Sequence, residues 1–305
     1  MKSVSSRFEP SKAFVVFHLV TSSVFWGCSF LFIKHIGNGL SPAVLASLRA
    51  AGGALTLAVI VVAMHKPVWP QGREWLDWTV LGTVNGWVPN ILVAYALSHM
   101  DSGPGAILQA SGPLMTAILA HALLAGERLT AVRFAGICVG LIGVAILIGP
   151  DAFAGGGTTL AIIAMLAVTF GYSLGNIYAR KIPAADPLRL ALGQQIASAI
   201  FATLAALAFA GSDGFSGVGE YMLPLVLLCV FSTALPIWLF MRLLTAAGPT
   251  KAAMTGYLVP AVAVCAGVVF LGEPVVMRQI IGGSIVLVGV AIVTGVLQLA
   301  RTKTP

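Results

Sequence analysis

Residues 126–146 read GERLTAVRFAGICVGLIGVAI, and residues 272–292 read GEPVVMRQIIGGSIVLVGVAI. Both segments open with Gly-Glu, carry a glycine ten positions further on and end with Gly-Val-Ala-Ile, at a constant offset of 146 residues. Because this offset is about half the chain length, the sequence is a duplicated unit, and internal repetition has to be recognised before a fold is assigned. We expect the two units to be residues 1–150 and 151–305.

The composition indicates a protein whose surface faces lipid. Of the 305 residues, 58% are apolar and only 9% are charged, and the mean hydropathy is +0.98, whereas ordinary soluble domains carry about 25% charged residues. A membrane span needs about 20 apolar residues. Ten such runs predict an all-α polytopic membrane protein, with ten transmembrane helices arranged as two five-helix repeats. The expected spans are residues 14–35, 42–64, 77–98, 103–124, 131–149, 158–180, 187–210, 221–245, 250–271 and 277–298.

The distribution of basic residues predicts the orientation. With both termini in the cytoplasm, fourteen of the seventeen lysines and arginines fall on the inner side, and only Lys34 and Arg278 fall on the outer side. This bias is the positive-inside pattern and predicts a multi-pass protein of the bacterial inner (plasma) membrane. The net charge of +7 is then a topology signal, so we expect no nucleic-acid partner. Because each half has five spans, the repeats are expected to be inverted about an axis in the membrane plane.

Short motifs recur in the same order in both halves. The first half has Phe25-Trp26-Gly27, Arg49, Tyr95-Ala96-Leu97 and Gly126-Glu127, and the second has Phe170-Gly171, Arg242-Leu243-Leu244, Leu258-Val259-Pro260 and Gly272-Glu273. In this arrangement the chain resembles the EamA-type members of the drug/metabolite transporter superfamily over nearly its whole length. Within them it is similar to the YddG-like exporters of aromatic and other amino acids. One departure is Gln194, which stands where alignment of the repeats places Arg49, so a role for that arginine applies to one half only.

Two prolines predict interruptions at mid-membrane depth. Pro89 and Pro236 lie 147 residues apart in the third and eighth expected spans. Proline removes a helix hydrogen bond, and the freed carbonyl is tolerated in a membrane only where protein or a cavity satisfies it. Paired interruptions in corresponding spans point to a transport site; a packing kink with satisfied polar groups is the alternative. A second pair, Pro113 and Pro260, supports the same interpretation more weakly.

Polar and aromatic side chains around these prolines predict the substrate site. Neutral hydrogen-bonding groups and aromatic faces suit an amphipathic solute, such as an amino acid, better than an ion. The alternative for each residue is core packing, a helix-linking hydrogen bond or an anchor at the membrane interface. The expected substrate-binding residues are Trp26, Asn85, Trp87, Asn90, Gln109, Tyr172, Asn176, Trp238 and Tyr257, and the expected hinges are Pro89, Pro113, Pro236 and Pro260.

Arg49 is a cation inside the second expected span, roughly 10 Å below the outer surface at a rise of about 1.5 Å per residue. A buried cation needs a partner. Two roles stay open: a contact with an anionic group of the substrate, or a structural bond to helix-end carbonyls or a loop carboxylate.

The acidic residues predict facilitated transport. None falls at mid-membrane depth, and only His18 and His121 offer a titratable group inside a span. Proton-coupled carriers usually need such a group, so we expect a facilitative carrier that exports its solute by alternating access. Proton-coupled efflux of lipophilic cationic drugs or transport of nucleoside-type metabolites is the alternative. Glu127 and Glu273, at opposite mouths, are expected to cap or latch helix ends against Arg128 or Arg278.

Other functional classes receive little support. Residues 171–175, GYSLG, match the GxSxG pattern of hydrolases, but that motif needs a strand-to-helix turn, and here it lies inside a span. The four cysteines fall inside spans without metal-binding spacing, so we expect no enzyme activity, metal or cofactor. Gly136 and Gly140 form a GxxxG pair, for which contacts within the chain are favoured over dimerisation. We therefore expect a monomer whose partners are the lipid bilayer and a small-molecule substrate.

Overall fold

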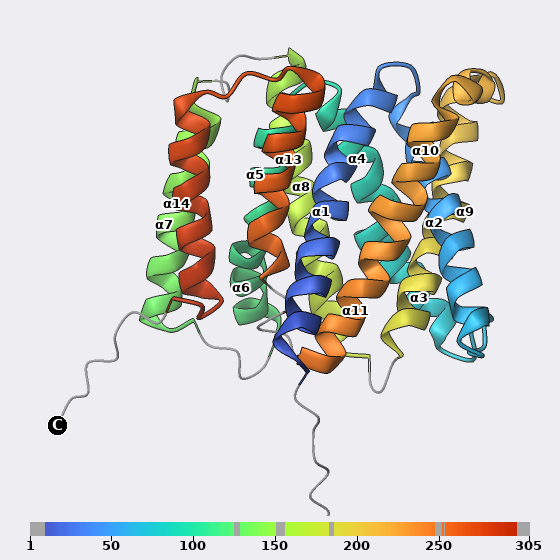
Figure 1. Ribbon diagram of the computed structural model, residues 1–305, viewed down its shortest axis with the longest axis horizontal. Helices are drawn as coiled ribbons and strands as arrows, with labels where there is room; N and C mark the ends of the chain where they lie inside the picture. The colour runs from blue at the N-terminus through green and yellow to red at the C-terminus, as the bar shows by residue number, and fades with distance from the viewer. Residues whose placement is uncertain are drawn as a thin grey trace, which may run out of the picture.

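The chain folds into α-helices that run side by side along one direction (Figure 1). The computed structural model describes residues 10–124, 129–150, 156–182, 186–247, 252 and 254–297. Within these ranges eight helical segments are long and apolar enough to cross a membrane, and two further apolar helices have 17 residues each. The prediction of an all-α polytopic protein is confirmed for the described residues, which contain no strand, and eight of the ten expected spans reach membrane-spanning length.

Several of the spans are built from two or more helical pieces. The third span joins α3 to α4 through the π-helix η1, and the long segment Asp213–Leu244 contains the 3₁₀ segment η3 and the π-helix η4. The elements are α1 (Lys12–Gly37), α2 (Pro42–Ala63), α3 (Glu74–Gly82), η1 (Thr83–Trp87), α4 (Val88–Leu97), α5 (Ser102–Ala110), α6 (Gly112–Leu123), α7 (Ala131–Ile148), α8 (Gly156–Arg180), α9 (Pro187–Ala210), η3 (Asp213–Tyr221), α10 (Met222–Cys229), η4 (Val230–Ala234), α11 (Leu235–Ala247), α13 (Thr255–Leu271) and α14 (Met277–Val293).

Large apolar side chains cover the outside of the bundle. Leu55 on α2 is 69% exposed, Phe209 on α9 is 86% exposed, and Val269 and Phe270 on α13 are each 72% exposed. A soluble protein rarely exposes so much contiguous apolar surface. These side chains therefore face lipid, which agrees with the composition.

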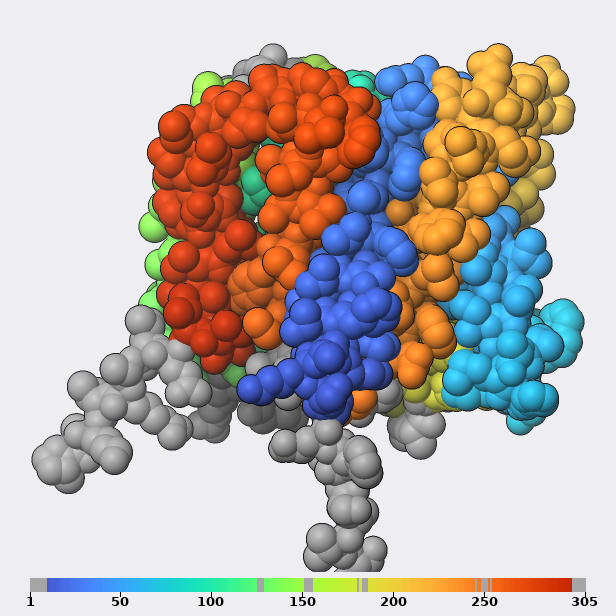
Figure 2. Space-filling model, viewed as in Figure 1, coloured from blue at the N-terminus to red at the C-terminus, as the bar shows by residue number. Residues whose placement is uncertain are grey.

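The helices of the two halves pair in a corresponding way. In the first half α1 contacts α11 and α13, and in the second half the matching helix α8 contacts α4 and α6. Figure 2 shows α1 and α11 side by side on one face, with a hollow between α13 and α14. Helix α2 packs against its counterpart α9, and α7 packs against α14. The main helix contacts therefore run between the two halves, and each half packs against the other.

Glycines allow α7 and α14 to approach closely. A Cβ atom added to Gly143 would lie 2.5 Å from the backbone N of Val286, and one added to Gly289 would lie 2.5 Å from the backbone N of Gly140. Small residues let helix backbones meet in this way. The glycines that we expected to make contacts within the chain do so here, between the last helices of the two halves.

Candidate functional site

The two mid-span interruptions are π-helices at matching positions. Element η1 covers Thr83–Trp87, and η4 covers Val230–Ala234, which is 147 residues further on. Each is followed after one residue by proline, Pro89 or Pro236. A π-helix holds one extra residue in its turn and is frequently found at functional sites. The interruptions predicted from the prolines are therefore present in both halves.

The four predicted hinge prolines do not behave alike. Pro89 lies in the first turn of α4 and Pro236 in the first turn of α11. Pro113 follows a break between α5 and α6 at Ser111, whose backbone N–H bonds to the Leu108 carbonyl three residues back. At Pro89 and Pro236 a π-helix runs directly into the turn, so each proline lies inside a continuous span and removes one helix hydrogen bond. Pro260 lies inside the continuous helix α13.

Glycines of α8 bring η1 close to the second half of the chain. A Cβ atom added to Gly171 would lie 2.7 Å from the Val84 carbonyl oxygen, and one added to Gly175 would lie 2.9 Å from Asn85 Cβ. Between them Ser173 is buried, and its hydroxyl donates to the Thr169 carbonyl at 2.8 Å. The GYSLG sequence is thus a helix-packing surface for η1.

Two of the predicted site residues use their polar groups within the protein. Asn85 Nδ2 donates to Gln194 Oε1 at 3.1 Å, and Gln194 Nε2 donates to the Asn85 carbonyl at 3.1 Å. Trp87 Nε1 donates to Thr83 Oγ1 at 3.3 Å, and its ring lies 6.4 Å from that of Phe201. These contacts fix η1 against α9, so both residues have a structural partner.

Arg49 makes the corresponding contact in the other half. From α2 it reaches η4, where its Nε donates to Thr233 Oγ1 at 3.1 Å. Gln194 and Arg49 thus link α9 to η1 and α2 to η4 respectively. The sequence showed that Gln194 corresponds to Arg49 in the repeat. It did not show that each of these residues bonds to a π-helix, Gln194 to Asn85 and Arg49 to Thr233.

Four predicted site residues keep polar atoms that make no hydrogen bond to a described residue. None of these atoms belongs to the group that is both inaccessible to water and without a hydrogen-bond partner. Each atom is therefore accessible to water. Such groups remain available to a solute. The four residues are Trp26 on α1, Asn90 on α4, Gln109 on α5 and Tyr172 on α8.

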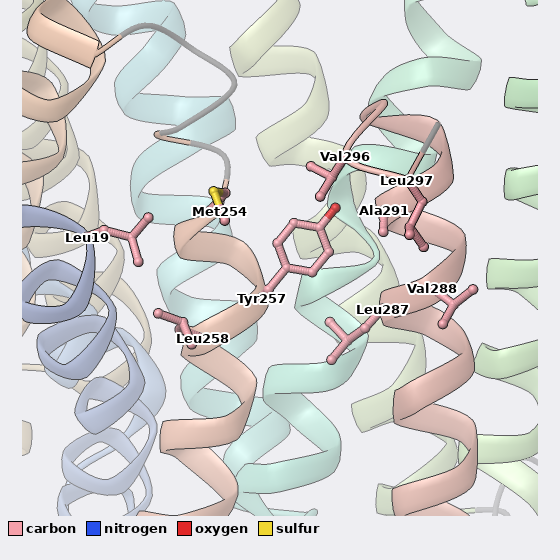
Figure 3. Close-up of a pocket in the computed structure, with 9 residues that line it drawn as sticks. All are labelled: Leu19, Met254, Tyr257, Leu258, Leu287, Val288, Ala291, Val296 and Leu297. Atoms are coloured by element: carbon pink, nitrogen blue, oxygen red, sulfur yellow. The ribbon is translucent and has the colours of Figure 1, made fainter. Parts of the chain in front are cut away.

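The remaining predicted site residues lie in other surroundings. Trp238 on α11 packs under Arg242, whose Cζ atom is 5.2 Å from the ring centroid, and Trp238 Nε1 is sealed with no described partner. Asn176 near the end of α8 is exposed, although we expected it to face the interior. Tyr257 lines an apolar pocket of about 340 Å³ between α13 and α14 (Figure 3), and its hydroxyl lies 2.7 Å from Thr294 Oγ1.

A polar cluster joins the two halves at the end of the bundle where α1 finishes. Glu273, which follows α13, accepts from the backbone N–H of Ser102 at 3.0 Å and from its hydroxyl at 2.6 Å. Lys34 Nζ lies 3.1 Å from Glu273 and 2.8 Å from Asp101. We expected Arg278 as the partner of Glu273, but its Nη1 donates to the Ile148 carbonyl instead. Glu127 and Arg128 lie outside the described residues.

The two histidines inside spans lie in different settings. His18 is buried, and its Nδ1 lies 2.9 Å from the Phe14 carbonyl in the same helix, while its Nε2 is sealed without a described partner. His121 is exposed near the end of α6 and accepts from the backbone N–H of Leu129 at 3.4 Å. No group of three or more metal-ligating side chains occurs in the described ranges.

Comparisons with known proteins support this architecture. A crystal structure with 18% sequence identity covers 94% of this chain and 98% of its own with a TM-score of 0.67, so the two share a fold. An uncharacterized transporter of Archaeoglobus fulgidus is 26% identical over 90% of this chain and 96% of its own length. An uncharacterized protein of Pseudomonas aeruginosa is 30% identical over 81% and 82% of the two chains, and a WAT1-related chloroplastic protein of Arabidopsis thaliana is 23% identical over 90% and 68%.

The family model matches the chain twice. Residues 13–149 and residues 159–295 each match the EamA-like transporter family, so the two matched segments together take in all but the ends and a short middle stretch. This double match agrees with the duplicated unit and with the paired π-helices. The chain therefore belongs to the EamA-like transporter family.

Proposed function

We propose that this membrane transporter exports amino acids, aromatic or neutral, or similar small amphipathic metabolites from the cytoplasm by alternating access. All ten helical segments cross the inner membrane as two inverted repeats, divided near residue 150, with both termini in the cytoplasm. Lys34 and Glu273 then lie at the outer face, where their ion pair joins the two halves. Transport is facilitative and follows the solute gradient.

The paired π-helices are the observation that carries this proposal. Elements η1 and η4 interrupt corresponding spans 147 residues apart, next to Pro89 and Pro236. Transporters bind substrate where such paired helices are broken at mid-membrane depth. Trp26, Tyr172 and Asn90 lie on helices that contact a π-helix. Together with Gln109 on α5 they offer aromatic faces and neutral amides, groups that suit an amphipathic solute.

Alternating access follows from how the elements are joined. The outer cluster ties Lys34 and Ser102, from the first half, to Glu273, from the second. Opening that face requires the two halves to separate there, while η1 and η4 supply weak points at which α4 and α11 can bend. A rocking motion of broken helices against the rest is the usual solution for inverted repeats.

The experiment is counterflow of labelled amino acids into liposomes that contain the purified protein. Exchange of aromatic or neutral amino acids, with the same rate at equal pH and with an imposed pH gradient, is the expected result. Rates that follow the gradient would instead indicate proton coupling and direct attention to His18. Absence of exchange for every amino acid would overturn the proposed substrate class, and lipophilic cations and nucleosides would be tested next.

A further inference from the structure

We propose that Arg49 binds a carboxylate group of the transported solute, at a site formed by α2, α8 and η4. The inference rests on the carrier function proposed above and names the chemical class of its substrate, a monocarboxylate, to which amino acids belong. It depends on three observations: the single bond that Arg49 makes to the protein, the accessibility of its other N–H groups, and the distribution of acidic side chains.

Among the described residues, the fold uses one nitrogen of Arg49. Its Nε donates to Thr233 Oγ1 at 3.1 Å, and the Thr233 hydroxyl donates in turn to the Leu228 carbonyl at 2.8 Å. No other hydrogen bond or ion pair connects the Arg49 guanidinium to the part of the chain that the structure describes. The threonine therefore positions the guanidinium and leaves the N–H groups of Nη1 and Nη2 free.

The free N–H groups face space that water can enter. Six side-chain polar atoms in the described ranges are sealed and without a partner, and none belongs to Arg49 or Tyr172. The Tyr172 phenol and the Cys229 thiol are near enough to Arg49 to interact with it electrostatically. Two donors without a described partner, one from α2 and one from α8, thus lie close enough to interact in the interior of the bundle.

No acidic side chain that the structure describes neutralises Arg49. Asp101 and Glu273 bind Lys34, Asp186 binds Lys66, and Glu74 binds Arg189. A charged arginine at this depth is costly, and intramembrane charges usually mark substrate pathways. None of the ion pairs among the described residues involves Arg49, and a carboxylate group of the solute would supply the negative charge.

A carboxylate fits this position better than other anions. A guanidinium donates two parallel N–H bonds to one carboxylate in a planar, bidentate contact, and the single positive charge of Arg49 balances a single negative charge. A phosphate monoester carries a charge of about −1.5 to −2 at neutral pH, which this one arginine cannot balance. The Tyr172 hydroxyl can donate to the same carboxylate oxygen atoms.

The test compares the wild-type protein with Arg49→Gln. Glutamine is the residue at the matching place of the second repeat, Gln194, where it is accommodated inside a span. Labelled phenylalanine is the counterflow substrate, and the competitors are 3-phenylpropionate, phenylalaninamide, phenethylamine and phenyl phosphate. Arg133→Gln, at an exposed position at the start of α7, controls for the loss of an arginine. Thermal unfolding of the purified proteins, with and without each compound, reports folding and binding apart from transport.

In the wild-type protein, phenylalanine and 3-phenylpropionate are expected to compete and to raise the unfolding temperature, while the amide, the amine and the phosphate do not. In Arg49→Gln the carboxylates should bind about tenfold more weakly, which is the loss expected for about 1.4 kcal/mol. Phenylalanine exchange with unchanged carboxylate preference in a folded Arg49→Gln would overturn this inference and leave the carrier function standing. Carboxylate binding that depends on Arg49, without any exchange, would overturn the carrier function alone. Stronger competition by phenyl phosphate than by 3-phenylpropionate would overturn the carboxylate assignment and indicate a phosphate ligand.

Should Arg49→Gln fail to fold, Tyr172→Phe and Thr233→Val provide the second measurement. Each removes one hydroxyl and keeps the guanidinium. Both are expected to weaken 3-phenylpropionate binding by a few fold while phenethylamine stays without effect. Equal binding of 3-phenylpropionate to both variants and to the wild-type protein would overturn the inference.

Discussion

Lys34 and Glu273 join the first half of the chain to the second, with Lys34 Nζ 3.1 Å from Glu273 Oε1. The two residues are 239 positions apart in sequence, and the Glu273 side chain is only 8% exposed. The same carboxylate accepts two bonds from Ser102 at the start of α5. An ion pair with this little solvent contact loses much of its stabilisation when one partner is removed, so this pair holds the two halves together at the face that we propose to be the outer one.

Replacing Glu273 by glutamine should open the outer face more often. The glutamine keeps the shape of the side chain and removes the charge that holds Lys34, so the closed state becomes less favourable. We expect a membrane-impermeant thiol reagent, added from outside, to label Cys229 about fivefold faster, which corresponds to a shift of about 1 kcal/mol. The measurement uses a protein in which Cys28, Cys138 and Cys265 are alanine.

Asp101→Asn is the matched control for the Glu273 variant. Asp101 also binds Lys34, at 2.8 Å, but its side chain is 36% exposed, and exposed pairs contribute little. Labelling of Cys229 in this variant should stay close to the rate in the parent protein. Equal labelling rates in both variants and the parent would show that the Glu273 contact does not control access.

Replacing Pro236 by alanine should stabilise the protein and slow transport. Alanine restores an N–H donor in the first turn of α11, which favours continuation of the helix and removes a break that costs about 3 kcal/mol or more in a helix interior. The unfolding temperature should rise, the initial counterflow rate should fall several-fold, and the half-saturating solute concentration should change little. Pro89→Ala should act in the same way in the first half.

Pro42→Ala separates this effect from a general effect of proline. Pro42 is the first residue of α2, where no helix hydrogen bond is lost, so its replacement should leave the counterflow rate unchanged. If Pro236→Ala transports at the wild-type rate, η4 does not act as a hinge.

Replacing Gly143 by alanine should destabilise the contact between α7 and α14. Its new Cβ atom would lie 2.5 Å from the Val286 backbone N and 2.8 Å from the Gly282 carbonyl oxygen, and backbone atoms cannot move aside at little cost. We expect a loss of about 1–3 kcal/mol, the usual effect of overpacking, measured as a lower unfolding temperature. Gly37→Ala in α1, which meets nothing within 4 Å, should be neutral or stabilise by about 0.5–1 kcal/mol.

Asp186 should stabilise the start of α9 in a pH-dependent way. Burial alone would raise the pKa of Asp186, but a hydrogen bond from Lys66 and bonds from the backbone N–H groups of Leu188 and Arg189 outweigh it and hold the pKa below its ordinary value. A lowered pKa in the folded state stabilises the protein above the unfolded pKa of about 3.9, and the effect disappears as the pH falls through the folded pKa.

Asp186→Asn tests this dependence. At pH 7 the variant should be less stable by about 0.2–1 kcal/mol, the range for a partly exposed ion pair, because asparagine can still cap the helix but no longer pairs with Lys66. The difference in unfolding temperature between variant and wild type should shrink as the pH falls below about 4. A difference that stays constant from pH 7 to pH 3 would mean that the carboxylate charge is not involved.

The sequence predicts the helical architecture well because both of its signals are local. Apolar runs mark the helices, and the spacing of Pro89 and Pro236 marks the two interruptions without any knowledge of contacts. The expected ends of α2 and α9 lie within one residue of those in the structure. The π-helical form of the interruptions was not predictable, because it depends on how η1 and η4 pack against neighbouring helices.

The site was predicted less completely, since a side chain's partner depends on contacts between distant segments. Asn85 and Trp87 were predicted to bind the solute, and the sequence did not indicate that Gln194 and Thr83 would be their hydrogen-bond partners. Glu273 was matched to Arg278 because the two are near in sequence, whereas its partner Lys34 is 239 residues away. The rotation of each helix about its axis decides such pairings, and glycine contacts such as that of Gly175 with Asn85 set that rotation.

The two π-helices also record the history of the gene. A π-helix arises when one residue is inserted into an α-helix, and here the five-residue segments at 83–87 and 230–234 occupy the same place in both halves. Two independent insertions at one register are far less economical than a single insertion that was copied. The shared position is therefore what a single interruption, present in a half-length unit before it was duplicated, would leave in both halves.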